Sequence, residues 1–334
     1  MSAEPHHEPH HRHSHLPVNA ERATLTRRAA LASVSVALFL LGLKGWAAFE
    51  TNSVAMLGSL ADTGLDIIAS LVTLYSVHLA AQPADLEHRF GHGKAEALAA
   101  LFQTSVITGS ALVIGWRGIS HFGTDAPPAH PELGIGVSLV AIVMTFALIT
   151  YQKFVVKTTG SVAIHADHVH YSSDLLLNAS VIAALALDSV LNVRGADPLF
   201  GVLIAGWLIW HAREVALSAI DQLMDREWPT EKRERFLAVA QSHAELRGIH
   251  DMRTRTSGAH DFVQFHVWVD PGMTVFDAHR VMDEVEAKLM IEFPGTEVLI
   301  HPDPEGHSAE ELGYAASLST AHQAEGQDLL NTRS

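Results

Sequence analysis

The chain has 334 residues, 48% of them hydrophobic, and a mean hydropathy of +0.16. Acidic residues outnumber basic ones by 37 to 22, and the formal net charge of −15 argues against nucleic acid as a partner. The chain contains no cysteine, which excludes disulfides and thiolate metal sites. The 23 histidines are a high count for this length, so their positions along the chain matter.

The first fifteen residues, MSAEPHHEPHHRHSH, contain six histidines and two prolines. They lack the basic start and apolar core of a signal peptide, and their bias predicts a disordered cytoplasmic tail over residues 1–24. The string His-Glu-x-x-His runs from His7 to His11, but a metalloprotease site needs it on a helix, which Pro9 disfavours. Weak metal capture by the tail and a merely solvated tail both remain open.

Six apolar segments follow, each near the roughly 20 residues that a membrane-spanning helix needs. They occupy residues 27–49, 54–81, 95–119, 132–154, 164–188 and 198–221. The first and third connections carry no lysine or arginine and the fifth carries only Arg194, whereas the other connections carry several. The positive-inside rule then places both ends of the chain in the cytoplasm. We therefore expect a polytopic α-helical membrane domain of six transmembrane helices over residues 25–222.

Residues 223–304 show the pattern of a small soluble domain with elements in the order α-β-β-α-β. Predicted helices cover residues 230–245 and 274–293, and predicted strands cover residues 248–257, 261–270 and 296–303. In the middle strand, one face consists of Val263, Phe265, Val267 and Val269, and the other of Phe262, Gln264, His266 and Trp268. This predicts an α+β domain with helices on one face of a small sheet. Residues 305–334 are polar and acidic and predict a disordered tail.

Two of the apolar segments contain aspartates well inside their ends, although an Asp at the centre of a membrane helix costs roughly 2.5 to 3.5 kcal/mol. Asp62 and Asp66 are four residues apart, and so are His170 and Asp174, which places each pair on one helix face. If the two faces meet, three carboxylates and one imidazole converge. A divalent cation such as Zn²⁺ would offset both their repulsion and their desolvation. The alternative is a polar helix-packing network, or one that binds only protons.

The connection between the second and third segments reads QPADLEHRFGHGKAE and holds Asp85, His88 and His92 within eight residues. This spacing suits a loop metal site, although histidines in short loops are often inert. The string GHGK resembles the end of a phosphate-binding loop, but His88 stands where that motif needs its first glycine, so this interpretation is discarded.

The soluble domain places histidines on neighbouring strands, where they are either metal ligands or inert surface residues. The candidates are His250, His266 and His301 with Asp303, and His279 on the intervening helix.

Together these residues resemble the cation diffusion facilitator family, and in particular its bacterial ferrous-iron and zinc efflux branch. The resemblance rests on the strings SLADTGLD, QPADLEHRFGHGKAEALAAL, HADHVHYSSD, RTRTSG and EVLIHPDP, and it extends over about residues 25–304. It implies a homodimeric metal/proton antiporter with six transmembrane helices and a cytoplasmic metallochaperone-like domain.

The resemblance also implies three metal sites and one charge pair, all of which are intact in this chain. The transport site comprises Asp62, Asp66, His170 and Asp174, the loop site Asp85, His88 and His92, and the cytoplasmic dimer-interface site His250, His266, His279, His301 and Asp303. Lys94 and Asp225 match a charge pair that locks the subunits where the membrane and cytoplasmic domains meet. Pro302 stands between His301 and Asp303 and can alter the local geometry, so the cytoplasmic site is the least direct of the assignments that the resemblance implies.

The resemblance implies a secondary active transporter, not an enzyme, in the bacterial inner membrane and without an organic cofactor. We expect it to export Zn²⁺, and also Cd²⁺ or Fe²⁺, from the cytoplasm. Mn²⁺ and Co²⁺ stay open as cargo, whereas nitrogen and oxygen ligands disfavour Cu⁺. The alternative is a metal sensor or structural membrane protein that binds cations without moving them. A complete ligand set inside the spans argues against that alternative.

Overall fold

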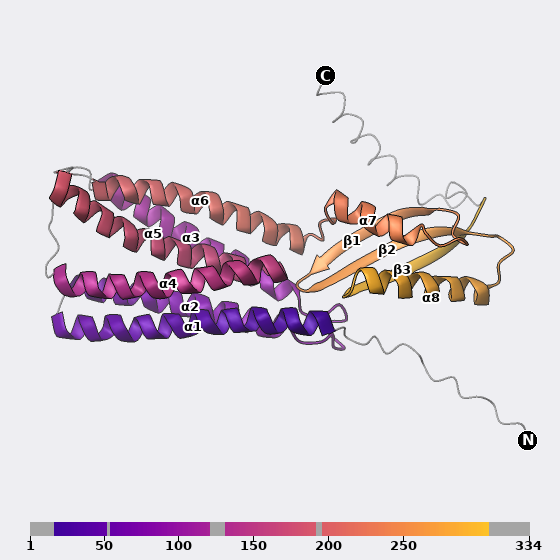
Figure 1. Ribbon diagram of the computed structural model, residues 1–334, viewed down its shortest axis with the longest axis horizontal. Helices are drawn as coiled ribbons and strands as arrows, with labels where there is room; N and C mark the ends of the chain where they lie inside the picture. Colours follow the sequence, from indigo (N-terminus) through magenta and orange to yellow (C-terminus); the bar gives the residue numbers. More distant parts are fainter. Residues whose placement is uncertain (1–16, 52–53, 121–130, 192–195, 307–334) are drawn as a thin grey trace, which may run out of the picture. The chain divides into compact units, whose positions relative to one another are not determined.

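The computed structural model describes residues 17–51, 54–120, 131–191 and 196–306 (Figure 1). The chain divides into two compact units. The first holds residues 1–227 and 255–261, and the second holds residues 228–254 and 262–334. Each unit has a hydrophobic core of its own among its described residues.

Six long helices form most of the first unit and coincide with the six predicted apolar segments to within a few residues at most ends (Figure 1). They are α1 (Pro17–Thr51), α2 (Val54–Ala80), α3 (Lys94–Ser120), α4 (Pro131–Thr159), α5 (Val162–Leu191) and α6 (Ala196–Leu223). Over their described residues, α1, α2, α3, α4 and α6 are long and apolar enough to cross a membrane. The remaining helix, α5, has 30 residues and carries Asp167 and Asp174 among its apolar side chains.

Helix α1 begins at Pro17, well before the predicted span at residue 27. Residues 17–24 are therefore helical, which corrects the prediction that the disordered tail extends to residue 24. Apolar residues mark only the part of a helix that lipid can cover. The preceding stretch NAERATL is rich in strong helix formers, and a proline in the first helical turn loses no hydrogen bond. The rest of both predicted tails, residues 1–16 and 307–334, lies outside the described residues.

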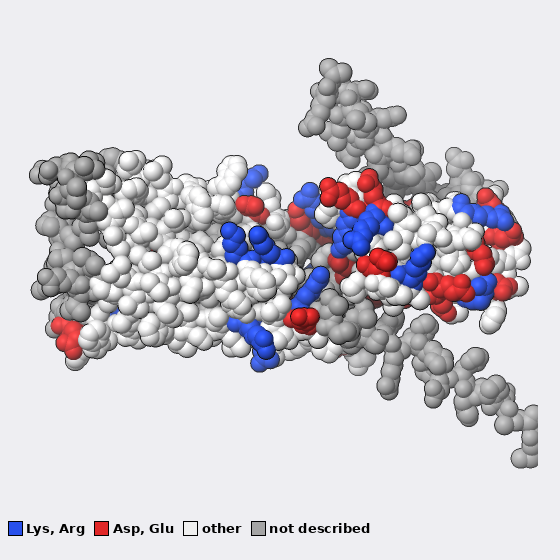
Figure 2. Space-filling view, viewed as in Figure 1, with Lys and Arg blue, Asp and Glu red and all other residues white. Residues whose placement is uncertain are grey.

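The outer surface of the helical unit is strongly apolar. Large side chains such as Phe49, Trp116 and Trp210 are exposed. Figure 2 shows few charged side chains over the middle of the helices in that view. Exposed apolar surface on several long helices is the pattern expected where lipid, not water, surrounds the protein.

Small residues allow α3 and α6 to pack closely. Their shared core contains the buried alanines Ala97, Ala100, Ala111, Ala205, Ala212 and Ala219. A Cβ atom added at Gly118 of α3 would lie 2.8 Å from the carbonyl oxygen of Pro198 in α6. Close backbone approach through Gly and Ala is typical of membrane helices, because apolar burial alone does not favour protein over lipid as a neighbour.

The second unit contains two helices and most of a three-stranded sheet in the order β1-β2-β3. The elements are α7 (Thr230–Ala240), β1 (Ile249–Ser257), β2 (His260–Val269), α8 (Val275–Glu292) and β3 (Thr296–Pro304). The predicted order α-β-β-α-β is confirmed, and with it the α+β class of this domain. Helix α7 ends at Ala240, earlier than predicted, where the Ser242 hydroxyl donates to the Val239 carbonyl at 2.5 Å and the chain turns.

The apolar face of β2 packs against both helices. Its side chains Val263, Phe265, Val267 and Val269 are buried, as predicted, together with Phe236 of α7 and Val281, Val285 and Leu289 of α8. The side chains of Gln264, His266 and Trp268 alternate with them and remain exposed or half-buried. The helices thus cover one face of the sheet, and the histidines occupy the other.

Removing a ring from this core should destabilise the soluble unit. Phe236 is fully buried, so Phe236→Ala should lower the free energy of unfolding by about 3 to 5 kcal/mol. Phe276, which is 79% exposed, is the matched control, and Phe276→Ala should change that free energy by about 0.5 kcal/mol at most. Urea unfolding of residues 228–305, followed by tryptophan fluorescence, measures both. Equal effects of the two substitutions would contradict the assigned core.

Candidate metal centres

A first cluster joins α2 and α5 inside the helical unit. The His170 Nε2 atom lies 3.1 Å from Asp66 Oδ1 and 3.9 Å from Asp174 Oδ2. The ligand atoms of these three residues all lie within 4.8 Å of one another. Tetrahedral ligands about 2.0 Å from a Zn²⁺ ion are about 3.3 Å apart, so a small inward movement of Asp174 would complete three corners of such a shell.

The predicted fourth ligand, Asp62, is not part of this group. It lies on α2 one turn before Asp66, and its side chain is exposed. Next to it, Thr63 is buried and accepts a hydrogen bond from Lys44 Nζ of α1 at 2.7 Å. Lys44 is close enough to Asp174 to interact electrostatically with it. The cluster therefore has a cation nearby that can partly offset its negative charge.

Helices α2 and α5 are joined beside this cluster by Tyr171, which the sequence analysis did not single out. The Tyr171 hydroxyl donates to the carbonyl of Ser33 in α1 at 3.2 Å and lies 2.8 Å from the hydroxyl of Ser70 in α2. Tyr171 follows His170, and Ser70 lies one turn after Asp66. These bonds therefore help to set the spacing of the two helices that carry the cluster. Their only signal in the sequence is a polar ring inside an apolar segment.

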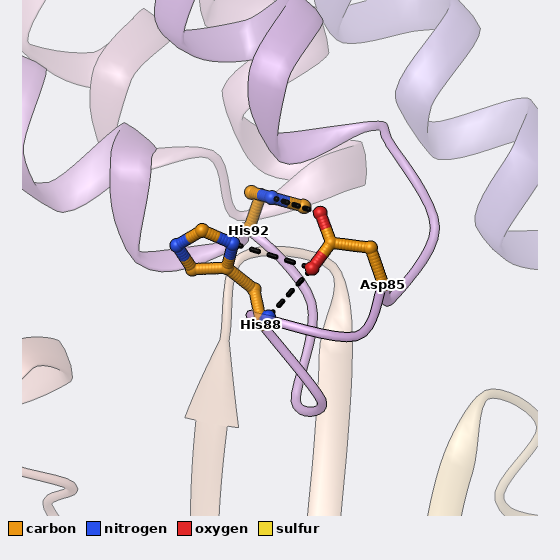
Figure 3. Close-up of side chains that lie close together, drawn as sticks. All are labelled: Asp85, His88 and His92. Carbon is orange, nitrogen blue, oxygen red and sulfur yellow. Dashed lines mark hydrogen bonds and ion pairs between the residues drawn. The ribbon is translucent and has the colours of Figure 1, made fainter.

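A second cluster lies in the loop between α2 and α3 and contains Asp85, His88 and His92 (Figure 3). The carboxylate of Asp85 contacts both imidazoles, with Oδ1 3.3 Å from His88 Nδ1 and Oδ2 3.3 Å from His92 Nε2. Gly91 has a φ of 77°, which lets the loop turn sharply between the two histidines. The three side chains that the sequence placed together thus converge in the structure.

The loop holds Asp85 in its ionised form. The pKa of Asp85 is below its usual value, chiefly because the backbone N–H of His88 donates to Oδ1, at 2.6 Å. The backbone N–H of Glu87 donates to the same oxygen at 2.9 Å. Because an ionised carboxylate is the form that binds a metal, the loop is preorganised for a cation over the physiological pH range.

A third cluster lies on the histidine face of the sheet and takes one residue from each strand. These residues are His250 of β1, His266 of β2 and Asp303 of β3. Asp303 Oδ2 lies 2.9 Å from His266 Nδ1 and 3.2 Å from His250 Nε2. Trp268 stacks on His250 with ring centroids 4.3 Å apart and restricts its orientation.

His301 lies at the edge of this third cluster. Its Nε2 atom is 3.2 Å from Asp303 Oδ1, the oxygen that His250 and His266 leave free. The two oxygens of Asp303 thus face different histidines, an arrangement that suits a carboxylate bridging two ions. Strand β3 runs through Pro302 without interruption, so this proline does not separate His301 from Asp303.

His279, predicted for the same site, lies elsewhere. It is exposed on α8, where its Nε2 atom is 3.8 Å from Asp283. Helix α8 packs against the valine face of the sheet, whereas the cluster occupies the other face. Within one chain, His279 therefore does not join the cluster.

The predicted charge pair forms within the chain. Lys94 Nζ lies 3.0 Å from Asp225 Oδ1 and donates to the carbonyl of Leu223 at 3.2 Å. Leu223 ends α6, and Asp225 has a φ of 54°, the left-handed conformation that often closes a helix. Lys94 thus places a cation at the negative end of α6 and joins it to the start of α3.

Comparison with known proteins agrees with this arrangement. Residues 30–224 match the cation efflux transmembrane domain, and residues 228–305 match the cytoplasmic domain of cation efflux proteins. The chain is 42% identical over 287 residues to the cation-efflux pump FieF of Cronobacter sakazakii, covering 86% of this chain and 95% of that pump. The chain belongs to the cation diffusion facilitator family.

Two further comparisons are with a second pump and with a solved structure. FieF of Yersinia pestis is 41% identical over the same length and coverage. A solved structure of CzrB, described as a putative zinc transporter, is 38% identical over 24% of this chain and 99% of that one, with a TM-score of 0.23. Members of the family are membrane transporters for cations, and this chain has the helices, the cytoplasmic domain and the clustered metal ligands that such a transporter needs.

The loop cluster of this cation diffusion facilitator should lose its metal when the charge of Asp85 is removed. Asp85→Asn keeps an oxygen for the backbone N–H groups of Glu87 and His88, but it replaces the second ligand oxygen with an amide that cannot bind a cation. We expect the affinity of the loop for Cd²⁺ to fall at least tenfold. Mutating a residue that only supports a ligand typically lowers metal affinity about 10- to 100-fold, and Asp85 would be a ligand itself. Isothermal titration of the full chain measures it. Glu87→Gln, at an exposed neighbouring acid, is the control and should bind Cd²⁺ as wild type does. Unchanged binding in Asp85→Asn would remove Asp85 from the site.

Proposed function

We propose that the chain exports Zn²⁺, and also Cd²⁺ or Fe²⁺, from the cytoplasm in exchange for protons. It acts as a homodimer in the bacterial inner membrane, with both termini in the cytoplasm. The observation that carries this proposal is the convergence of Asp66, His170 and Asp174 from two helices in an apolar bundle. The dimer rests on the family match of residues 228–305.

A divalent cation suits this cluster because its charge balances that of the two carboxylates. Without a cation, two aspartates within 4.8 Å of the same imidazole repel each other in surroundings that hydrate them poorly. Imidazole and carboxylate donors together favour Zn²⁺ and similar borderline ions over the soft Cu⁺. Asp62, one turn away on α2, is the nearest carboxylate on that helix for a fourth ligand and would need a change of side-chain conformation to reach the ion.

Proton exchange follows from the chemistry of the ligands. Carboxylates and imidazole bind a metal only when they are deprotonated, so binding releases protons and protonation releases the metal. Histidine ordinarily titrates near pH 6.5, within the range of a physiological proton gradient. If the site opens alternately to the two sides, a higher proton concentration outside unloads the metal there and returns the protonated site with little net charge.

The other two clusters serve the cytoplasmic side of the cycle. In the proposed topology the loop between α2 and α3 and the soluble domain both face the cytoplasm. The loop cluster takes up ions near the transport helices, and the Asp303 cluster responds to the metal load and stabilises the dimer. Both consist of imidazole and carboxylate groups, which are metal ligands, and a role in moving or sensing ions fits both.

Loss of Asp66 should abolish export. Asp66→Asn removes one charge and one ligand from the cluster, so Zn²⁺ uptake into inside-out proteoliposomes with an acidic interior should fall to the level of empty vesicles. Glu231→Gln, at an exposed acid on α7, is the matched loss of charge and should transport normally. Wild-type protein that binds Zn²⁺ but shows no flux would favour a sensor and contradict export.

Replacing the only nitrogen ligand should change the metal preference. His170→Asp keeps an ionisable ligand of shorter reach but exchanges imidazole for a harder carboxylate and adds a negative charge. We expect the preference for Zn²⁺ over Mn²⁺ to fall about tenfold and the pH profile of uptake to shift, because a carboxylate deprotonates at lower pH than an imidazole. Parallel Zn²⁺ and Mn²⁺ fluxes between about pH 5.5 and 8 measure both effects. An unchanged ranking and profile would show that His170 is neither ligand nor proton carrier.

A further inference from the structure

Asp167 is a fully buried aspartate that the proposed transport site does not use. It lies on α5, one turn before His170. Among the described residues, no lysine or arginine forms an ion pair with it. An acidic group with no cationic partner in the interior of a membrane protein is costly, so its surroundings must supply compensating interactions.

Three neutral donors converge on the Asp167 carboxylate. Oδ2 accepts from the hydroxyl of Ser33 at 2.5 Å and from the amide of Gln152 at 2.8 Å. Oδ1 accepts from the amide of Gln103 at 3.1 Å. Thr73 donates to the side-chain oxygen of Gln103 at 2.8 Å and thereby holds the NH₂ group of that amide toward Asp167. We call Asp167, Ser33, Thr73, Gln103 and Gln152 the polar node.

The polar node joins five helices at one level. Ser33 belongs to α1, Thr73 to α2, Gln103 to α3, Gln152 to α4 and Asp167 to α5. Its members are almost completely buried, with exposures of 0% or 1%. Four of these helices thus bond to α5 directly or through one amide. A carboxylate is the group best suited to the centre, because it accepts several hydrogen bonds and donates none.

The polar node and Tyr171 together bracket His170. Asp167 fixes α5 on one side of this residue, and Tyr171, bonded to Ser33 and Ser70, fixes it on the other. Rotating a helix by about 20° moves an atom about 6 Å from its axis by about 2 Å. Metal–ligand distances tolerate only about 0.2 Å. The rotation of α5 must therefore be held closely if His170 and Asp174 are to face Asp66.

We propose that Asp167 is a positioning residue that sets the rotation of α5 through the polar node and so aims His170 and Asp174 at α2. The inference rests on the proposed transport site, and it assigns Asp167 no contact with the metal or with transported protons. Asp167 acts through its hydrogen bonds. The negative charge can therefore be moved to another member of the node without loss of function, as long as every hydrogen bond is kept.

This interchange provides the test. Asp167→Asn puts an amide where three donors converge, so at least one bond of the present arrangement must be lost or must reverse its direction. The double variant Gln103→Glu/Asp167→Asn moves the charge from α5 to α3. The carboxylate introduced on α3 accepts from Thr73 and from the NH₂ group of the amide introduced on α5, while the oxygen of that amide accepts from Ser33 and Gln152. Every bond of the node can then form again.

Two measurements on the full chain report the outcome. Proteoliposome flux gives the KM and kcat for Cd²⁺, and isothermal titration gives the Kd of the transport cluster in a background with His88→Ala and His266→Ala. We expect Asp167→Asn to raise KM and Kd at least tenfold, in the range typical of lost outer-sphere partners, and the double variant to restore both to within about threefold of wild type. Thr104→Val is the control, because Thr104 is buried like its neighbour Gln103 but its hydroxyl donates only within its own helix, and it should change neither value.

Two results would overturn the proposal. A wild-type KM and Kd in Asp167→Asn would show that the node does not position the ligands. A double variant that stays monodisperse but remains as impaired as Asp167→Asn would show that the charge itself is needed on α5. If Asp167→Asn does not fold, Ser33→Ala removes one donor to Asp167 and one acceptor of Gln152 and should still raise KM by about threefold. A wild-type KM in that variant would count against the node. Cd²⁺ binding without flux in the wild type would refute export and leave the Kd comparison intact.

Discussion

The helical unit depends on one constraint, which is that a buried polar group without a partner is costly in a bundle surrounded by lipid. Helices satisfy their own backbone, but the side chains of Asp66, Asp167 and His170 find partners across helix boundaries. These partners in turn restrict how the helices can be rotated and spaced. The ligands of the proposed transport site and the bonds that hold its helices are therefore two parts of the same polar interior.

The part of the candidate site that follows from the spacing of residues along a helix could be predicted from the sequence. His170 and Asp174 share a face because they are four residues apart, and two matched pairs in apolar segments pointed to a meeting of α2 and α5. Spacing also puts Asp62 on the face of Asp66, yet its side chain is exposed and outside the cluster. Which member of a pair reaches the centre depends on the rotation and tilt of α2, and these are set by packing with other helices.

The same limit explains the other differences. The alternation of β2 predicted which face is buried, but nothing local to His279 shows that α8 packs on the face opposite the histidines. The polar node escaped prediction because its members come from five helices, and each looks alone like an ordinary polar residue in a span. The early start of α1 was missed because apolar length measures contact with lipid, whereas helix propensity continues into polar sequence.

The two kinds of buried carboxylate in this bundle differ in what satisfies them. Asp167 is surrounded by donors that belong to the protein, so its partners remain with it whatever ion is bound. Asp66 and Asp174 share one imidazole between them, which leaves acceptor positions that an exchangeable cation or proton can fill. A transporter needs both kinds of carboxylate. If the protein filled every acceptor position of the ligands, the site would bind no ion. If no hydrogen bonds fixed the helices, the ligands would have no defined geometry to select an ion. In the proposed mechanism, the permanent partners of Asp167 keep α5 in place while the partners of Asp66, His170 and Asp174 are exchanged.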